Sequence, residues 1–180
     1  MKNSIKRFIK DIIPVLLGVL IALWINNWNE ARKDRNYIHN FYASLKQELS
    51  DTDKEITLKT PNQKVLLDTL DAYADNSSLT LIEVIEKGEG VNGPNIKLNY
   101  WKAISNSKIE LIDYKKLSLL ADLEEGDELL NYKRNKLIDF IYANLTKTGK
   151  EEKVIMRIMM EEMVRTQLGI QEDIQKFLQK

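Results

Sequence analysis

The sequence predicts an all-α protein, in which an N-terminal transmembrane helix continues into a juxtamembrane helix and a small extramembrane helical bundle. Glycine and proline are scarce, at 7 and 3 of 180 residues, whereas a sandwich or barrel needs frequent turns. Apolar residues recur at helical spacings along most of the chain. One early stretch is uncharged throughout. We therefore divide the chain into a cytoplasmic tail and transmembrane anchor (1–29), a juxtamembrane helix (30–56) and a helical domain (57–180).

The anchor is predicted from residues 12–29, which include no charged side chain. As an α-helix this stretch would be about 27 Å long, close to the roughly 30 Å of a bilayer's hydrocarbon core. Lys10 precedes it and can extend its ammonium group to the headgroups. Pro14 is expected near the helix start, where its missing N–H costs little.

The polar end of the anchor is typical of a helix that leaves lipid. Trp24 and Trp28 are four residues apart and share a helix face, and their amphipathic rings suit the headgroup layer. Lys10, Trp24 and Trp28 are therefore our candidate interface anchors. A cleaved signal peptide would need small residues at its cleavage site, which are missing here, so we expect an uncleaved signal anchor. A buried soluble helix would not need the basic flank or the two tryptophans.

The charges around the anchor set its expected orientation. The positive-inside rule counts lysines and arginines, and it favours a cytoplasmic N-terminus and a periplasmic C-terminal domain by a small margin. The cations concerned are Lys2, Lys6, Arg7 and Lys10 before the anchor, and Arg32, Lys33 and Arg35 after it.

Two surfaces of the N-terminal helices could meet other helices. Gly18, Ala22 and Asn26 follow one another at intervals of four, so a second transmembrane helix could approach closely and bond to the asparagine. The juxtamembrane helix carries an apolar stripe that would pack on the domain or, alternatively, on a second copy. The stripe consists of Ile38, Phe41, Tyr42, Leu45, Leu49 and Ile56.

Local signals mark the helices of the domain. Thr60 and Pro61 predict a helix start, with threonine as N-cap and proline in the first turn. Thr80 and Glu83 form a capping-box pattern before a short helix that should end at Gly88. The glycine-rich residues 88–95 predict a surface connection.

Three later glycines are expected to interrupt the helices of the C-terminal half. We expect a helix junction at Gly126, between a run from Asp113 and a helix over 127–145. Gly149 predicts a turn, and Gly169 predicts a break that leaves a short last helix.

Two segments resemble an uncharacterised family of small bacterial single-span membrane proteins, a domain of unknown function. The first is "GVLIALWINNWNEARK" (18–33), with an IALxxNNWNE exit signature, and the second is "WKAISNSKIELIDYKKLSLLADL" (101–123). Trp24 and Asn106 depart from the family's usual polar residue and glycine. The resemblance covers most of the chain and implies a protein of the Gram-negative inner membrane, but it brings no known activity.

The sequence offers little for catalysis. Equal numbers of acidic and basic residues, 27 each, give no net basic charge to attract nucleic acid. Cysteine is absent, so disulfides and thiolate chemistry are excluded. His39 is the only histidine, and no known catalytic or metal-binding motif is present. The acidic clusters at 124–128, 151–152 and 161–162 are interpreted as helix-terminal and solvated charges, and Met156, Met159, Met160 and Met163 as core.

We therefore expect an accessory or interaction subunit of an inner-membrane protein complex, with no catalytic activity of its own and no cofactor. Its partners would be the lipid bilayer and other membrane subunits, bound through the transmembrane helix and the juxtamembrane stripe, with homo-oligomerisation as an alternative. The competing hypothesis is an extracytoplasmic ligand-binding or sensing module, with a pocket near Tyr100, Trp101 and the methionines. An enzyme is the third hypothesis.

Overall fold

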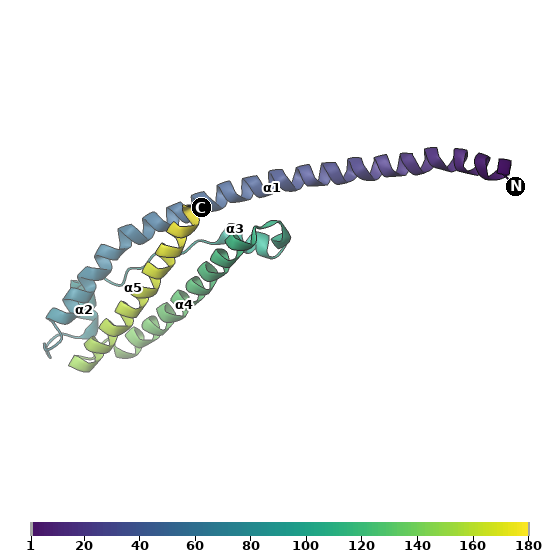
Figure 1. Cartoon of the computed structure of the whole chain (residues 1–180). Helices are drawn as coiled ribbons and strands as arrows, with labels where there is room; N and C mark the ends of the chain where they lie inside the picture. The colour runs from purple at the N-terminus through teal and green to yellow at the C-terminus, as the bar shows by residue number, and fades with distance from the viewer. Residues whose placement is uncertain (1, 180) are drawn as a thin grey trace. The chain divides into compact units, whose positions relative to one another are not determined.

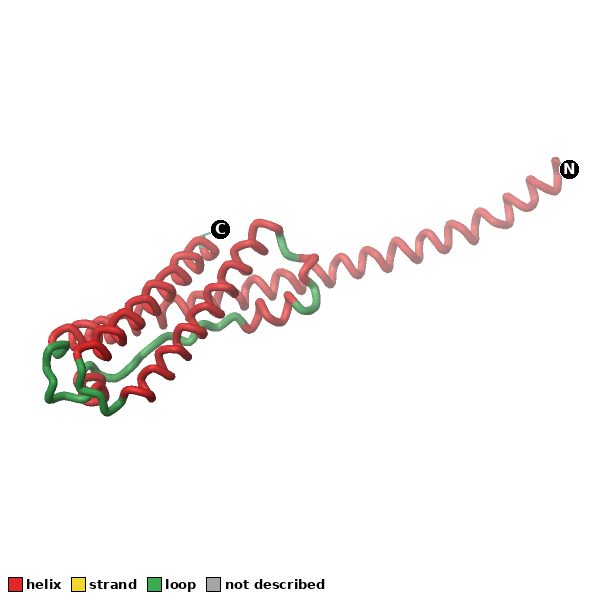
Figure 2. Tube along the Cα trace, turned by 90° about the horizontal axis from the view of Figure 1, so that it is seen from below, coloured by secondary structure: helices red, strands yellow, loops and turns green. Residues whose placement is uncertain are grey.

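The computed structural model of the protein describes residues 2–179, with side chains from residue 12 onward. All regular structure in this range is helical, which confirms the predicted all-α class (Figure 1, Figure 2). The elements are α1 (Lys2–Ala72), α2 (Leu81–Lys87), α3 (Asn99–Ser105), the short 3₁₀ helix η1 (Ile109–Leu111), α4 (Tyr114–Asn144) and α5 (Lys150–Leu178). The chain forms two compact units, Met1–Ala43 and Ser44–Lys180, which divide within α1.

Helix α1 is longer than the local signals predict. It includes both Pro14 and Pro61, which were expected to mark helix starts. It begins at Lys2, so Pro14 is not at its start, and the predicted new helix at Thr60 and Pro61 is wrong. The Thr60 hydroxyl donates back to the Ile56 carbonyl at 2.8 Å instead of capping a new N-terminus. Ile56 and Leu66 on either side are fully buried. Packing of the apolar face therefore outweighs the break that a threonine–proline pair favours.

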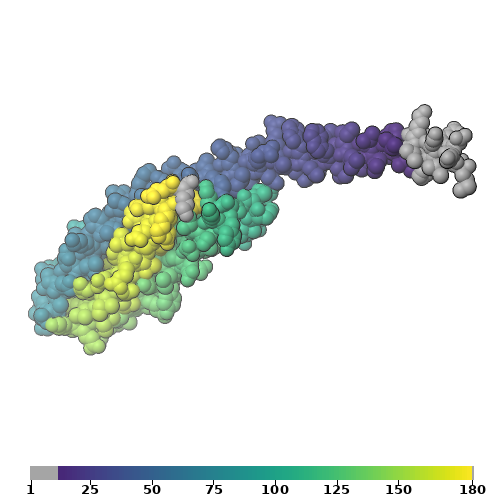
Figure 3. Space-filling model, viewed as in Figure 1, coloured from purple at the N-terminus to yellow at the C-terminus, as the bar shows by residue number. Residues whose placement is uncertain are grey.

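The second unit is a bundle with three long members: residues 44–72 of α1, then α4 and α5. Helix α5 runs antiparallel to α1, since Asp53 meets Gln171 and Asp71 meets Arg157. It also runs antiparallel to α4, since Gly126 lies against Ile170 and Lys133 bonds to Glu162. In the space-filling view α5 (yellow) lies along both neighbours on the visible face (Figure 3).

The fourth position of the bundle is filled by an extended segment, residues 89–98, which we name the strap, together with α3. The strap runs antiparallel to α1: the Asn95 N–H donates to Glu55 at 3.1 Å, and further along the Gln63 amide donates to the Asn92 carbonyl at 2.9 Å. Its burial alternates, with Pro94, Ile96 and Leu98 buried and the residues between them exposed. This period of two is that of an extended chain. Within the predicted surface connection, residues 88–95, only Gly88 and Pro94 are buried, so most of it lies at the surface as expected. The following Ile96 and Leu98 enter the core.

Helix α2 confirms the predicted capping box and its end at Gly88. The Thr80 hydroxyl accepts from the Glu83 N–H, and the Glu83 carboxylate accepts from the Thr80 N–H at 2.8 Å. The next two donors are also satisfied, because the Leu81 and Ile82 N–H groups bond to carbonyls at the end of α4 and just beyond it. The hydrogen bonds from the Thr80 hydroxyl and N–H lower the pKa of Glu83.

The predicted breaks at Gly126 and Gly169 are wrong, because both glycines lie within helices. Gly126 lies inside α4, where an added Cβ would come within 2.8 Å of the Ile170 side chain. This glycine lets α4 and α5 approach each other closely. Gly169 lies inside α5 and faces open space. Gly149 does mark a turn, as predicted, and it is the N-cap of α5.

The two helical glycines should respond oppositely to substitution. Gly169→Ala should raise the free energy of unfolding by about 1 kcal/mol, because alanine favours helix and nothing opposes its methyl group. Gly126→Ala gains the same propensity but presses on Ile170, and overpacking costs about 1–3 kcal/mol. We expect it to be neutral or destabilising. Urea unfolding followed by circular dichroism measures both, and equal stabilisation by the two variants would contradict the close approach at Gly126.

Candidate membrane anchor and neighbouring sites

The first part of α1 is long and apolar enough to cross a membrane. Its apolar window is not buried at all in the described structure, unlike the core helix of a soluble protein. The predicted candidate transmembrane helix near the N-terminus is thereby confirmed. Length, composition and exposure do not distinguish an anchor from a signal sequence, which satisfies the same criteria.

The predicted interface tryptophans project from this helix. Trp24 is 68% exposed and Trp28 is 52% exposed. The Arg32 guanidinium lies 5.9 Å from the Trp28 ring centroid, one helical turn beyond it. This cation–π contact places an aromatic ring and a positive charge together where the apolar run ends. Lys10, the third predicted anchor, has its side chain outside the described residues.

Gly18, Ala22 and Asn26 lie on the continuous helix and are exposed. A Cβ added to Gly18 would meet no atom within 4 Å, so this surface is open. The Asn26 amide donates to the Glu30 carboxylate at 3.4 Å, a long bond within the same helix. The asparagine is therefore only weakly engaged. A role of these three residues in helix packing stays a prediction.

Much of the juxtamembrane stripe belongs to the protein's own core. Leu45, Leu49 and Ile56 are fully buried within the second unit. Intramolecular packing is thus confirmed for these three residues, and they are not available to a partner. Ile38 and Tyr42 are half-buried.

The acidic cluster after residue 123 joins helices to one another. The Glu124 carboxylate accepts from the Trp101 indole N–H at 2.7 Å. Asp127 is only 6% exposed, accepts from the Asn131 amide at 3.0 Å and pairs with Lys102 at 3.5 Å. These carboxylates therefore tie α3 to α4, which is a structural role. Among the described side chains, no group of three or more acidic or histidine residues could hold a metal ion.

The burial of His39 and of the four methionines can be compared with their predicted roles. His39 is exposed. Met156, Met160 and Met163 are buried, which confirms their core role, and Met159 is half-buried.

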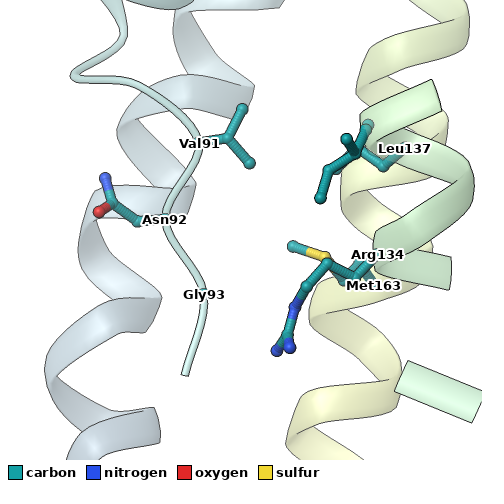
Figure 4. A pocket seen from close by; sticks show the side chains of 7 residues that line it. Val91, Asn92, Gly93, Arg134, Leu137 and Met163 are labelled. Carbon is teal, nitrogen blue, oxygen red and sulfur yellow. The ribbon is translucent and has the colours of Figure 1, made fainter. Parts of the chain in front are cut away.

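The pocket of the competing hypothesis is not where the sequence placed it. Tyr100 is exposed and Trp101 is buried against Glu124, and neither lines the pocket that contains Met163. That pocket lies between the strap and helices α4 and α5 (Figure 4). Of the residues named for the competing hypothesis, only Met163 lines this pocket, and ligand binding there stays a prediction.

Buried polar side chains are the main feature that sequence reasoning missed. Glu48 on α1 accepts from the backbone N–H groups of Asn99 and Tyr100, at 3.1 and 3.2 Å, and so caps α3. Lys153 is fully buried and donates to the carbonyls of Asn76 and Thr148. These groups hold the loops and short helices against the long ones.

A fully buried amide pair joins α1 to α5. The Gln63 amide nitrogen donates to the Gln167 oxygen at 2.9 Å, and the Gln167 nitrogen donates to the Gln63 oxygen at 2.8 Å. A signal for it exists in the sequence. Gln167 stands between Met163 and Ile170 at spacings of four and three, so it occupies a core position of the apolar pattern.

Comparison with known proteins gives no relative for this chain: no family model, no curated protein and no solved structure matches it.

Proposed function

We propose that this protein is a membrane-anchored accessory or interaction subunit of an inner-membrane protein complex, without catalytic activity of its own. The observation that supports this most is the exposed apolar stretch of α1, which no part of the described chain covers. A stretch of this length needs lipid or another helix around it. The resemblance of residues 18–33 to small bacterial single-span proteins supports an inner-membrane setting.

The contact with the partner is proposed to run along the anchor. Gly18 and Ala22 leave the helix backbone accessible, and Asn26 can exchange its long bond to Glu30 for one to a neighbouring helix. Since Phe41, Leu45, Leu49 and Ile56 are buried, the stripe can contribute only through its half-buried members Ile38 and Tyr42. A second copy of the chain is an alternative occupant of this face.

Substitutions on the anchor test the proposed face. Gly18→Ile adds bulk where a second helix would pack, and we expect it to abolish co-purification of the partner subunit in mild detergent. Leu16→Ile is the matched control, because it lies off this face and keeps the span apolar. Membrane insertion of both variants should be unchanged. Equal co-purification with the two variants would show that this face carries no contact.

The topology is proposed to place the N-terminus in the cytoplasm and residues after about Asn29 in the periplasm. A reporter that is active only in the periplasm should function when fused after Lys180, because the small excess of cations precedes the span. The matched fusion carries, at the same position, a reporter that is active only in the cytoplasm. Activity of the second reporter alone would reverse the proposed orientation. Release of the domain from the membrane fraction would contradict an uncleaved anchor.

A further inference from the structure

A cavity of about 270 Å³ opens between the strap and helices α4 and α5 (Figure 4). Its apolar lining combines two buried side chains, Leu137 and Met163, with the partly exposed Val91 and Ile138. The remaining lining comes from Asn92, Gly93 and Arg134. A volume of about 270 Å³ is more than one or two waters fill. That is close to the lower end of small-molecule pockets.

Arg134 is the only charged residue of this lining. Its guanidinium donates to the Asn131 side-chain oxygen at 3.0 Å and to the Pro94 carbonyl at 2.7 Å. Both acceptors are neutral, and no ion pair joins Arg134 to a carboxylate among the described side chains. A guanidinium stays charged at any physiological pH and has five N–H donors, so part of its donor capacity is free.

A purely structural role accounts for only part of this arrangement. The bond to Pro94 fastens the strap to α4, and a neutral donor would do the same. The nearby Asp127 is linked to Arg134 only through Asn131 and already pairs with Lys102. A half-buried cation without a counter-charge is costly, and an anion that reaches it is bound more strongly than at an open surface.

We propose that this cavity binds a small amphipathic carboxylate, with its carboxylate on Arg134 and its apolar body against Leu137, Ile138 and Met163. The planar guanidinium matches the geometry of a carboxylate. The apolar lining favours a compact hydrocarbon group and offers no second charge for a polar ligand. This site is independent of the anchor's partner, so either proposal can fail alone.

Phenylpropionate is a suitable probe, because it combines a carboxylate with one ring and a short chain. The full-length protein in lipid nanodiscs would be titrated by calorimetry, with empty nanodiscs as the blank. We expect saturable one-to-one binding of phenylpropionate. Phenylpropanol and phenylpropylamine, which lack the anion, should bind at least about tenfold more weakly. Equal binding of the alcohol, or no saturable binding of phenylpropionate, would overturn the proposal.

Two variants test the charge of Arg134 and the space of the cavity separately. Arg134→Gln should weaken phenylpropionate binding at least about tenfold while leaving phenylpropanol unchanged. Because this variant also loses the Pro94 contact, Val91→Phe provides a second test: it fills the mouth of the cavity, keeps Arg134 and should weaken both probes. Lys64→Gln, at an exposed cation on α1, is the matched control and should change neither. Retained affinity in Arg134→Gln, or inorganic phosphate binding as tightly as phenylpropionate, would overturn the assignment.

Discussion

Replacing Trp101 with alanine is expected to lower the free energy of unfolding by about 3–5 kcal/mol, the range for truncating a large buried aromatic side chain. Trp101 is 3% exposed, and its indole N–H bonds to Glu124 on α4. It lies on α3, which has only 7 residues and is too short to be stable without tertiary contacts. Loss of the side chain should therefore free α3 and the adjoining end of the strap.

Two further variants divide this effect into its parts. Trp101→Phe keeps most of the apolar area and removes the bond to Glu124, so we expect a smaller loss, of about 1–2 kcal/mol. Tyr100→Ala is the matched control, because this neighbouring aromatic is 46% exposed and should matter little. Urea unfolding followed by circular dichroism avoids the loss of tryptophan fluorescence. A loss in Trp101→Ala no greater than in Tyr100→Ala would contradict the role assigned to Trp101.

The apolar pattern of the sequence was sufficient for the class of the fold and for much of its core. Leu45, Leu49 and Ile56 stand at helical spacings on the juxtamembrane helix, and all three are fully buried. The capping box at Thr80 and Glu83 was also readable, because both partners lie within four residues of each other. Features that depend on spacing within one element are thus visible in the sequence.

Features that depend on a second element were not visible. Gly126 resembles a helix end locally, and only the position of Ile170 shows that it permits close packing. Pro61 resembles a helix start, but the buried residues on either side of it keep α1 continuous. The contacts that hold the strap could not be read locally, because the partners of its backbone are side chains on α1 and α4. Local propensity is a weak guide wherever tertiary packing decides.

The anchor could be predicted from the sequence, whereas the cavity could not. The exposed apolar helix near the N-terminus could be predicted, because its length and lack of charge are properties of one segment. The cavity joins residues 91–93, Arg134, Leu137, Ile138 and Met163, which no motif connects. Of the residues that the sequence suggested for a pocket, this cavity includes only Met163.

The second large effect is expected at the buried pair Gln63 and Gln167. Each amide donates to the other, and each has a second acceptor: the Asn92 carbonyl for Gln63 and the Thr60 hydroxyl for Gln167. Gln167→Leu leaves the Gln63 oxygen without its donor in a fully buried place. An unsatisfied buried polar group costs about 1–3 kcal/mol, so we expect a loss of about 2 kcal/mol.

The double variant Gln63→Leu with Gln167→Leu should be more stable than the sum of the two single losses predicts. Replacing both partners of a buried polar pair by apolar groups of similar size is often close to neutral. A double-mutant cycle on urea unfolding should give a coupling of at least about 1 kcal/mol between the two positions. Additive losses would show that the reciprocal amide bonds do not couple α1 to α5.

The same pair is expected to fix the register of α1 against α5. This role in structural specificity is distinct from its contribution to stability. The neighbouring core positions on α5, Met163 and Ile170, are apolar and would accept a shifted partner at little cost. An amide that must meet another amide allows one alignment, as a single buried asparagine does in a coiled coil. The double leucine variant should therefore keep its helix content and much of its stability, but exchange its buried α5 amide hydrogens faster than the wild type. Unchanged exchange would leave the pair with a role in stability alone.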